Sequence, residues 1–248
     1  KLNSSINASP AFNSNKIKFP QEANEDFARF AGYLVSEGYI LKRKTSTVFV
    51  FTNKDKELWK DFEKITKKLF NARLRVKTKQ IGKETREIII NSVDLSKFLE
   101  LNALEIMNKS RNRDIPQVIL KSPEKIAKQF IKAFIEAEGS VAKDRRVIEV
   151  VSASEKLIEN LQTLLLRFGI YSTKREMLTR ATNGKMKEKQ KYFKITVSGK
   201  QAVDYVKKIG FISKRKQESA LKIVESKKKL NTNIDIVPNL KDELKFSR

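Results

Sequence analysis

The sequence predicts an α+β protein made of two pseudo-symmetric halves, each with the element order αββαββα and a four-stranded antiparallel sheet. The first observation is a repeat: an apolar, helix-period segment containing Glu-Gly occurs at residues 27–40 and again at 129–142. The second is that similar helix-like and strand-like patterns follow each copy. Helices gathered on one face of each sheet leave the other face free for a ligand.

The first helix of each half is expected to pack against its repeat. Its core reads FAGYLVSEG at residues 30–38 and IKAFIEAEG at 131–139. Small residues lie four apart on each helix: Gly32 and Ser36 on the first, Ala133 and Ala137 on the second. This spacing lets two helix backbones approach closely. Gly38 and Gly139 are expected to end the helices in left-handed caps.

A second amphipathic helix and two pairs of strands complete each half. Residues 53–71 align with 152–170, and their apolar positions coincide. Strands are expected near 39–42, 47–52, 73–78 and 87–91, and near 147–152, 172–178 and 192–197. The last hairpin of the second half carries a longer basic loop, in which Asn183-Gly184 is a strong turn signal.

Composition divides the chain into five segments. Residues 1–16 are rich in Ser and Asn with few apolar anchors, which indicates a flexible lead-in. The two halves are expected at 17–108 and 124–224, joined by a linker at 109–123. Residues 225–248 form a basic, poorly periodic C-terminal segment.

The charge balance indicates a polyanionic partner. The 53 Lys and Arg outnumber the 29 Asp and Glu, which leaves a net charge of +24 spread along the whole chain. No apolar run approaches the roughly 20 residues of a membrane-spanning helix, so we expect no membrane partner. The chain has no Cys and no His, which excludes thiol nucleophiles, imidazole bases and the usual zinc sites.

Glu37 and Glu138 are the candidate catalytic acids. Each ends its repeated helix, where the negative end of the helix dipole disfavours a carboxylate unless a cation is present. Paired carboxylates with the backbone carbonyls of Gly38 and Gly139 suit hard cations such as Mg²⁺ or Mn²⁺. The alternative is that both are solvated helix-end residues of a purely structural repeat, and the recurrence of the pair favours the metal site.

The repeated segments FAGYLVSEG and IKAFIEAEG resemble the two motif copies of a single-chain LAGLIDADG homing endonuclease. The repeat around them covers nearly residues 17–230. The resemblance implies that the motif helices form the junction of the halves and that Glu37 and Glu138 bind metal. It also implies that the two sheets form a saddle along the DNA major groove and that both strands are cut to leave 3′ overhangs. Ala133 departs from the Gly of the family pattern, but it is small enough for close packing.

The resemblance also implies a basic residue that positions water or stabilises charge. Arg113, in the sequence RDIP, holds the family's place before the Pro, and Lys109 is a nearby competitor. An Arg acts there through its charge, because it cannot serve as a general base. In the second half, DIVP at 235–238 lacks the basic residue; Lys214 and Lys216 are weaker candidates there, and Lys216 aligns with Lys109.

Basic residues on or near the expected strands are the candidate DNA-binding set, namely Lys42, Arg43, Lys44, Arg73, Arg75, Lys77, Lys79, Lys174, Arg175 and Arg180. Any single one is an ordinary surface residue; as a set they suit phosphate and base contacts. The expected partner is double-stranded DNA with a long asymmetric target site. We expect an intracellular, nucleoid-associated monomer.

NTNIDIVP and KSRNRDIP resemble archaeal intein-embedded members of the family in particular. Lys1, Arg248 and the lack of His lead us to expect no splicing activity from the chain itself. Two alternatives to the endonuclease remain open. One is a catalytically inactive DNA-binding protein or RNA maturase on the same scaffold, and the other is a basic scaffold for ribosomal or membrane partners.

Overall fold

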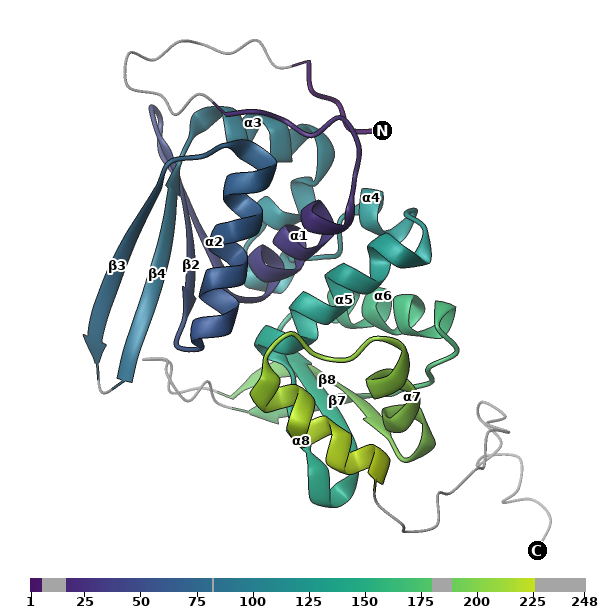
Figure 1. Ribbon diagram of the computed structural model, residues 1–248. Helices are drawn as coiled ribbons and strands as arrows, with labels where there is room; N and C mark the ends of the chain where they lie inside the picture. Colours follow the sequence, from purple (N-terminus) through teal and green to yellow (C-terminus); the bar gives the residue numbers. More distant parts are fainter. Residues whose placement is uncertain (6–16, 82, 180–188, 226–248) are drawn as a thin grey trace, which may run out of the picture.

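The computed structural model describes residues 1–5, 17–81, 83–179 and 189–225, and it has the two α+β halves that the sequence predicts (Figure 1). The first half consists of α1 (Glu25–Glu37), β1 (Gly38–Lys42), β2 (Thr47–Asn53), α2 (Lys56–Phe70), β3 (Leu74–Ile81), β4 (Lys83–Asn91) and α3 (Val93–Asn102). The second half consists of α5 (Glu124–Glu138), β5 (Ser140–Ala142), η3 (Lys143–Arg145), β6 (Val147–Ser152), α6 (Glu155–Arg167), β7 (Thr173–Thr179), β8 (Gln190–Ser198), α7 (Lys200–Lys208) and α8 (Lys214–Glu225).

The segment between the halves is short and partly helical. It contains η1 (Leu104–Met107), η2 (Ser110–Asn112) and α4 (Gln117–Leu120). None of the helices in the described residues has the length and apolar character needed to cross a membrane. The DIVP sequence at 235–238, the Asn183-Gly184 turn and most of the expected lead-in lie outside the described residues.

Polar residues set the start of several helices. Asn24, Asp55, Ser92 and Ser154 precede α1, α2, α3 and α6, and the side chain of each accepts a hydrogen bond from a backbone N–H two or three residues later. Such caps satisfy donors that have no partner inside the helix. The second helix of each half therefore begins at an equivalent residue, and the turn before α2 has the same place in its half as the turn before α6.

The two sheets have the same topology. The strand orders are β1-β2-β4-β3 and β5-β6-β8-β7, and every pair is antiparallel. The motif helix of each half runs directly into the first strand of its sheet, at Gly38 and at Gly139 followed by Ser140. The end of each motif helix is therefore fixed to an edge of its own sheet.

One face of each sheet packs on helices and the other remains open. In the first sheet Phe49, Phe51, Ile88 and Ile90 are fully buried beneath the helices, which cover that side in Figure 1. Because side chains alternate along a strand, residues one position away lie on the opposite face. The second sheet repeats this arrangement with Ile148, Val150, Ile195 and Val197 on its buried face.

The motif helices α1 and α5 lie side by side at the junction of the halves (Figure 1). A Cβ added to Gly32 would stand 2.7 Å from the carbonyl oxygen of Phe130 and 3.0 Å from Cβ of Ala133. The close packing expected from the small residues is therefore present. The Arg29 guanidinium reaches across the junction, where its Nη2 donates to Oε1 of Gln129 at 2.6 Å. It also forms an ion pair with Asp61 of α2.

The expectation of left-handed caps at Gly38 and Gly139 is wrong. Their φ angles are −77° and −80°, in the extended region open to any residue. Glycine is needed for space instead: an added Cβ would lie 2.2 Å from the Leu34 carbonyl oxygen at Gly38, and 2.5 Å from that of Ile135 at Gly139. The chain thus leaves each helix directly as a strand, close against the last helical turn.

Candidate active site

Glu37 and Glu138 are the last residues of α1 and α5, the two helices that pack at the junction. Both side chains reach solvent, but each also has many protein atoms around it, and this desolvation is the largest cause that raises both pKa values. The negative charge of Glu37 is the second cause for Glu138, whose pKa rises to about 7. The two carboxylates are therefore close enough to interact electrostatically.

Arg113 closes the carbonyl end of α1. Its Nη1 donates to the carbonyl oxygens of Val35 at 2.9 Å and Ser36 at 3.2 Å, and its Nη2 donates to that of Gly38. Burial lowers the pKa of Arg113, whereas the charges of Glu138 and Glu37 raise it. A cation at this point offsets the negative end of the helix dipole as well as the two acids.

Lys216, in the first turn of α8, makes the equivalent contacts at the end of α5. Its Nζ donates to the carbonyl oxygens of Glu136 and of Gly139, the latter at 2.6 Å. Aligning Glu37 with Glu138 places Val35 on Glu136 and Gly38 on Gly139, so Lys216 is the spatial counterpart of Arg113. The sequence alignment pairs Lys216 with Lys109 instead. Lys109 is exposed and lines neither of the two hollows at the carboxylates.

Each carboxylate lines its own hollow, and each hollow is built from both halves. The hollow at Glu37 has a volume of about 1010 Å³. It is lined by the turn from β2 to α2, the end of α5 and the start of α8, including Lys54, Asp55, Ala137, Arg215 and Lys216. The hollow at Glu138 is smaller, about 300 Å³. It is lined by the turn from β6 to α6, the end of α1 and the linker, including Ser36, Ser110, Arg113, Ser152 and Tyr192.

The donor set suits a hard divalent ion that keeps water or substrate oxygens among its ligands. Two carboxylates with raised pKa values gain from a neighbouring cation, and the C-terminal ends of two helices add negative potential. The described residues contain no group of three or more Asp, Glu, His or Cys arranged to hold a metal. A site with two carboxylates therefore suits Mg²⁺ or Mn²⁺ better than an ion that demands a closed protein cage.

The backbone groups near the two acids differ from the expected ligands. The carbonyl oxygens of Gly38 and Gly139 accept hydrogen bonds from Arg113 and Lys216. Ser36 and Ala137, each one position before a motif acid, line the hollow of the opposite acid. The two halves thus contribute residues to each other's hollow.

Two buried acids that the sequence reasoning did not single out hold the basic residues in place. Glu136 is 2% exposed and accepts hydrogen bonds from the backbone N–H groups of Ile212 and Ser213 and from the Ser213 hydroxyl. Asp114, also 2% exposed, accepts from Asn160 at 2.6 Å and pairs with Lys156. Their positions in the sequence could have indicated them, because Glu136 lies two residues before Glu138 and Asp114 directly follows Arg113.

The expected DNA-binding residues divide between the two faces of the sheets. Arg75 and Lys77 lie on the open face of β3, since their neighbours Leu74 and Val76 pair with the buried Ile90 and Ile88. Arg175 holds the corresponding place on β7. Residues at turns or strand ends are exposed, namely Arg43, Lys44 and Arg73. The side chain of Lys79 and the whole of Arg180 lie outside the described residues.

Two of the expected DNA-binding residues point to the helix side. Lys174 pairs with Ile195 of the buried face, and its Nζ lies 2.8 and 2.6 Å from Glu155 and Glu159 of α6. Lys42 is on the face of Phe49, and its Nζ lies 2.6 Å from Glu100 of α3. The geometry therefore does not meet the expectation for these two, because strand register directs them away from the open face.

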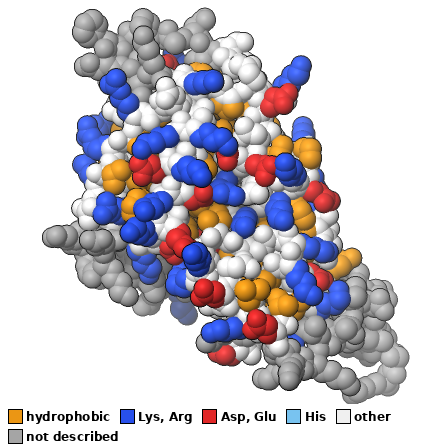
Figure 2. All heavy atoms as spheres, viewed as in Figure 1, with side chains coloured by type: hydrophobic (Ala, Val, Ile, Leu, Met, Phe, Trp, Pro, Cys, Tyr) orange, Lys and Arg blue, Asp and Glu red, His pale blue; other side chains and the backbone are white. Residues whose placement is uncertain are grey.

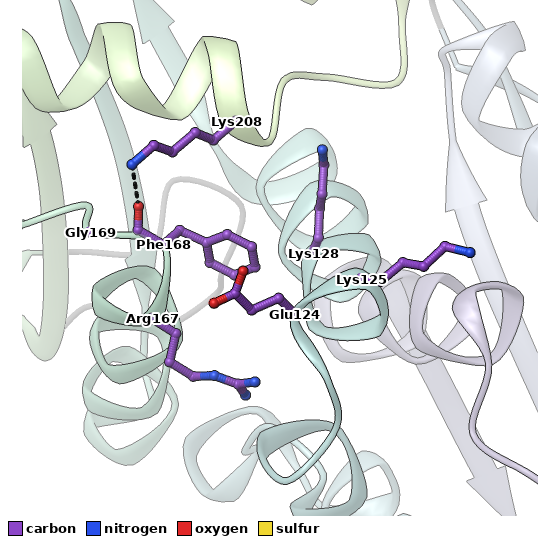
Figure 3. A pocket seen from close by; sticks show the side chains of 7 residues that line it. All are labelled: Glu124, Lys125, Lys128, Arg167, Phe168, Gly169 and Lys208. Atoms are coloured by element: carbon purple, nitrogen blue, oxygen red, sulfur yellow. Dashed lines mark hydrogen bonds between the residues drawn. The ribbon is translucent and has the colours of Figure 1, made fainter.

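Basic side chains also cover the helical side, where acidic ones are interspersed among them (Figure 2). A further hollow on this side, of about 680 Å³, is lined by Lys125, Lys128, Arg167 and Lys208 around Phe168 (Figure 3). Arg167 donates to backbone carbonyls of the α4–α5 connection, and Lys208 to the carbonyl of Phe168. These two cations therefore bind carbonyl oxygens at the ends of α4 and α6.

Comparison with known proteins identifies the family. The profile of the LAGLIDADG-like domain matches residues 24–102 and 125–210, one match in each half. The chain belongs to the LAGLIDADG family, which confirms the resemblance seen in the two motif copies.

Similar sequences occur within longer archaeal proteins. The chain is 28% identical over 226 residues to a replication factor C small subunit of Methanocaldococcus jannaschii, covering 91% of this chain and 11% of that protein. It is 33% identical over 221 residues to a probable translation initiation factor IF-2 of the same organism, covering 86% of this chain and 17% of that protein. The chain thus spans less than a fifth of the length of these relatives.

Two solved structures share the fold. The homing endonuclease I-DmoI in complex with DNA and Ca has a TM-score of 0.54 at 16% identity, covering 80% of this chain and 98% of that one. Full-length DUF199/WhiA from Thermatoga maritima has a TM-score of 0.54 at 12% identity, covering 92% of this chain and 66% of that one. At these identities the likeness concerns the fold, and it confirms the two-half α+β architecture.

Proposed function

We propose that this protein is a site-specific, divalent-metal-dependent homing endonuclease that cuts both strands of DNA and leaves 3′ overhangs. The observation that carries the proposal is that Glu37 and Glu138 end the two helices that pack closely at the junction of the halves, where the charge of Glu37 helps to raise the pKa of Glu138. Arg113 and Lys216 lie at the same junction, and their charges act on both acids. One acid and one cation in each hollow suit the hydrolysis of two phosphodiesters.

In the proposed site Glu37 and Glu138 hold Mg²⁺ or Mn²⁺. A divalent ion bound there supplies an activated water and stabilises the leaving oxygen of a phosphodiester. Arg113 and Lys216 would stabilise negative charge that develops on the phosphate, in hollows where desolvation strengthens such interactions. Arg113 keeps its proton throughout, so its contribution is electrostatic.

The open faces of the two sheets are the proposed DNA surface. Arg75, Lys77 and Arg175 would contact phosphates or base edges there, and Arg43, Lys44 and Arg73 would do so from turns and strand ends. The net charge of +24 supports a polyanionic partner. Because the halves differ in sequence, the target would be long and asymmetric, and one chain would suffice to bind it.

The relatives support a mobile genetic context. Homologous segments lie within archaeal proteins named as a replication factor C subunit, a translation initiation factor and an A-type ATP synthase subunit. These three proteins have different activities, whereas each contains a segment that is similar to this chain. We infer that the segment is an insert in such hosts, as an intein-embedded endonuclease would be.

A second candidate function is DNA binding without cutting. The likeness to DUF199/WhiA, which covers 92% of this chain, favours it, because that protein has the fold and is a different protein from the homing endonuclease I-DmoI. The two functions differ at the acids: a binding protein does not need the paired Glu37 and Glu138. Their retention with Arg113 and Lys216 favours the endonuclease.

The test is cleavage of a randomised duplex DNA library in the presence of Mg²⁺, followed by sequencing of the ends produced. We expect a restricted set of sequences cut on both strands with 3′ overhangs, and no products with EDTA or with Glu37→Gln or Glu138→Gln. Both variants should still bind the selected duplex. Binding of a selected duplex without cutting by the parent would support the second candidate and overturn the first.

A further inference from the structure

The segment that carries Lys216 belongs to the second half but is held by the first. The backbone N–H of Lys214, at the start of α8, donates to Glu57 of α2 at 2.6 Å. The guanidinium of Arg215 lies 3.6 Å from the carboxylate of Asp55, the residue that caps α2. The start of α8 therefore rests on the start of α2.

The segment that carries Arg113 has the opposite arrangement. It follows the first half and is held by α6 of the second. The Ser154 hydroxyl, at the cap of α6, donates to the carbonyl oxygen of Arg113 at 2.7 Å. The adjoining Asp114 accepts from Asn160 at 2.6 Å and lies 3.1 Å from Nζ of Lys156.

These two contacts are counterparts under the internal repeat. The alignment of α2 with α6 pairs Asp55 with Ser154, since 154 − 55 = 99, and Glu57 with Lys156, since 156 − 57 = 99. In the second of these pairs the side chains, Glu57 and Lys156, have opposite charges, and so do the segments that they meet. Glu57 meets the Lys214–Lys216 stretch, whereas Lys156 meets Asp114. Both halves thus keep the contact although the residues that form it have changed.

We propose that the first turns of α2 and α6 position the two active-site cations separately, so that Glu57 sets the place of Lys216 and Lys156 that of Arg113. Neither Glu57 nor Lys156 lines either of the two hollows at the carboxylates; each acts through the segment that it holds. This proposal rests on the proposed nuclease function. Because Lys216 lines the hollow of Glu37 and Arg113 that of Glu138, each contact governs the cutting of one strand.

The fold should survive the loss of either contact. Glu57 is exposed, and the segment before α8 remains tied to its own half by the buried Glu136, through Ile212 and Ser213. Lys156 is largely exposed as well. When the Lys156 side chain is removed, Asn160 still donates a hydrogen bond to Asp114. A change at either residue therefore alters the position of a cation more than it alters stability.

Hydrogen exchange measured on the full chain without DNA tests the positioning directly. In Glu57→Ala we expect backbone amides of residues 212–218 to exchange about threefold to tenfold faster, from the loss of one hydrogen bond to a charged group. Exchange at 110–116 should stay unchanged, and Lys156→Ala should show the reverse pattern. Glu57→Gln, whose side-chain carbonyl still accepts from Lys214, should restore slow exchange. Glu63→Ala on the same helix is the control.

Cutting of a supercoiled plasmid that carries the duplex selected by the parent protein tests the consequence. Glu57→Ala should slow one strand about threefold or more, so that nicked circles accumulate, with kcat reduced and KM for the plasmid unchanged. Lys156→Ala should slow the other strand. Equal slowing of both strands by either variant, or unchanged exchange at 212–218, would overturn the proposal. Failure of the parent to cut any DNA would refute the nuclease function, whereas the exchange experiment would still decide the positioning.

Discussion

Gly32 of α1 lies so close to Phe130 of α5 that a Cβ on the glycine would stand 2.7 Å from the Phe130 carbonyl oxygen. Real Cβ atoms do not approach backbone oxygen to this distance, so any larger residue must push the two helices apart. The position of one acid relative to the other therefore depends on a residue more than one helical turn away from either.

Gly32→Ala should destabilise the protein by about 1–3 kcal/mol, the usual cost of overpacking a close-packed core. The favourable helix propensity of Ala is worth about 1 kcal/mol in the opposite direction, so the expected net loss lies at the lower end of this range. Chemical denaturation monitored by circular dichroism measures the change. The control is Lys64→Ala on the exposed side of α2, which should change stability by less than about 0.5 kcal/mol. A Gly32→Ala variant as stable as the parent would contradict the close approach.

Glu138→Gln should remove a pH dependence of stability in the metal-free protein. The pKa of Glu138 is raised in the folded state from 4.5 to about 7, chiefly by desolvation and then by Glu37. Its contribution to stability is therefore fully present below pH 4.5 and is lost as the pH rises through about 7.

In EDTA at pH 8 we expect Glu138→Gln to exceed the parent in stability by about 1 kcal/mol, a figure reduced because solvent reaches the carboxylate. At pH 4 the two proteins should unfold alike. Thermal unfolding across this pH range measures the difference. Added Mg²⁺ should stabilise the parent more than the variant; a stability difference that stays constant with pH would argue against the shifted pKa.

Arg113→Lys should keep more activity than Arg113→Ala. Lys216 makes the equivalent contacts at the end of α5 with an ammonium group, so the ammonium group of Arg113→Lys should bind the same carbonyl oxygens. We expect the rate of cutting of one strand to fall about tenfold in Arg113→Lys and about a hundredfold or more in Arg113→Ala. Single-turnover cleavage of the selected duplex measures both rates, and equal losses of rate in the two variants would count against an electrostatic role.

Arg75→Ala and Lys77→Ala should each weaken DNA binding, whereas Lys174→Ala should not. The first two lie on the open face of the first sheet, and Lys174 is paired with Glu155 and Glu159 on the helix side of the second. Each lost phosphate contact should reduce the slope of log affinity against log salt by about 1. Fluorescence anisotropy at several salt concentrations measures the slope. A Lys174→Ala effect as large as that of Arg75→Ala would contradict the assignment of the faces.

The fold and the motif acids were accessible from the sequence because both are written in short-range patterns. Helix and strand periodicity depends on neighbouring residues, and the internal repeat shows each pattern twice. The resemblance to the family located Arg113, which is the first residue of the recognisable RDIP sequence. The sequence alignment paired Lys216 with Lys109, because an alignment does not show where α8 lies in space. In the structure Lys216 is the counterpart of Arg113.

The sequence alone determined that this chain has two similar α+β halves, that α1 and α5 pack through small residues, and that Glu37 and Glu138 end those helices. Only the tertiary structure decided which strand lysines reach the open face, since a single step in register reverses the face of every side chain. Only the tertiary structure also decided that the start of α8 contacts α2 of the first half and that the segment of Arg113 contacts α6 of the second. Contacts such as Glu57 with Lys214 join residues far apart in sequence, and no local pattern specifies them.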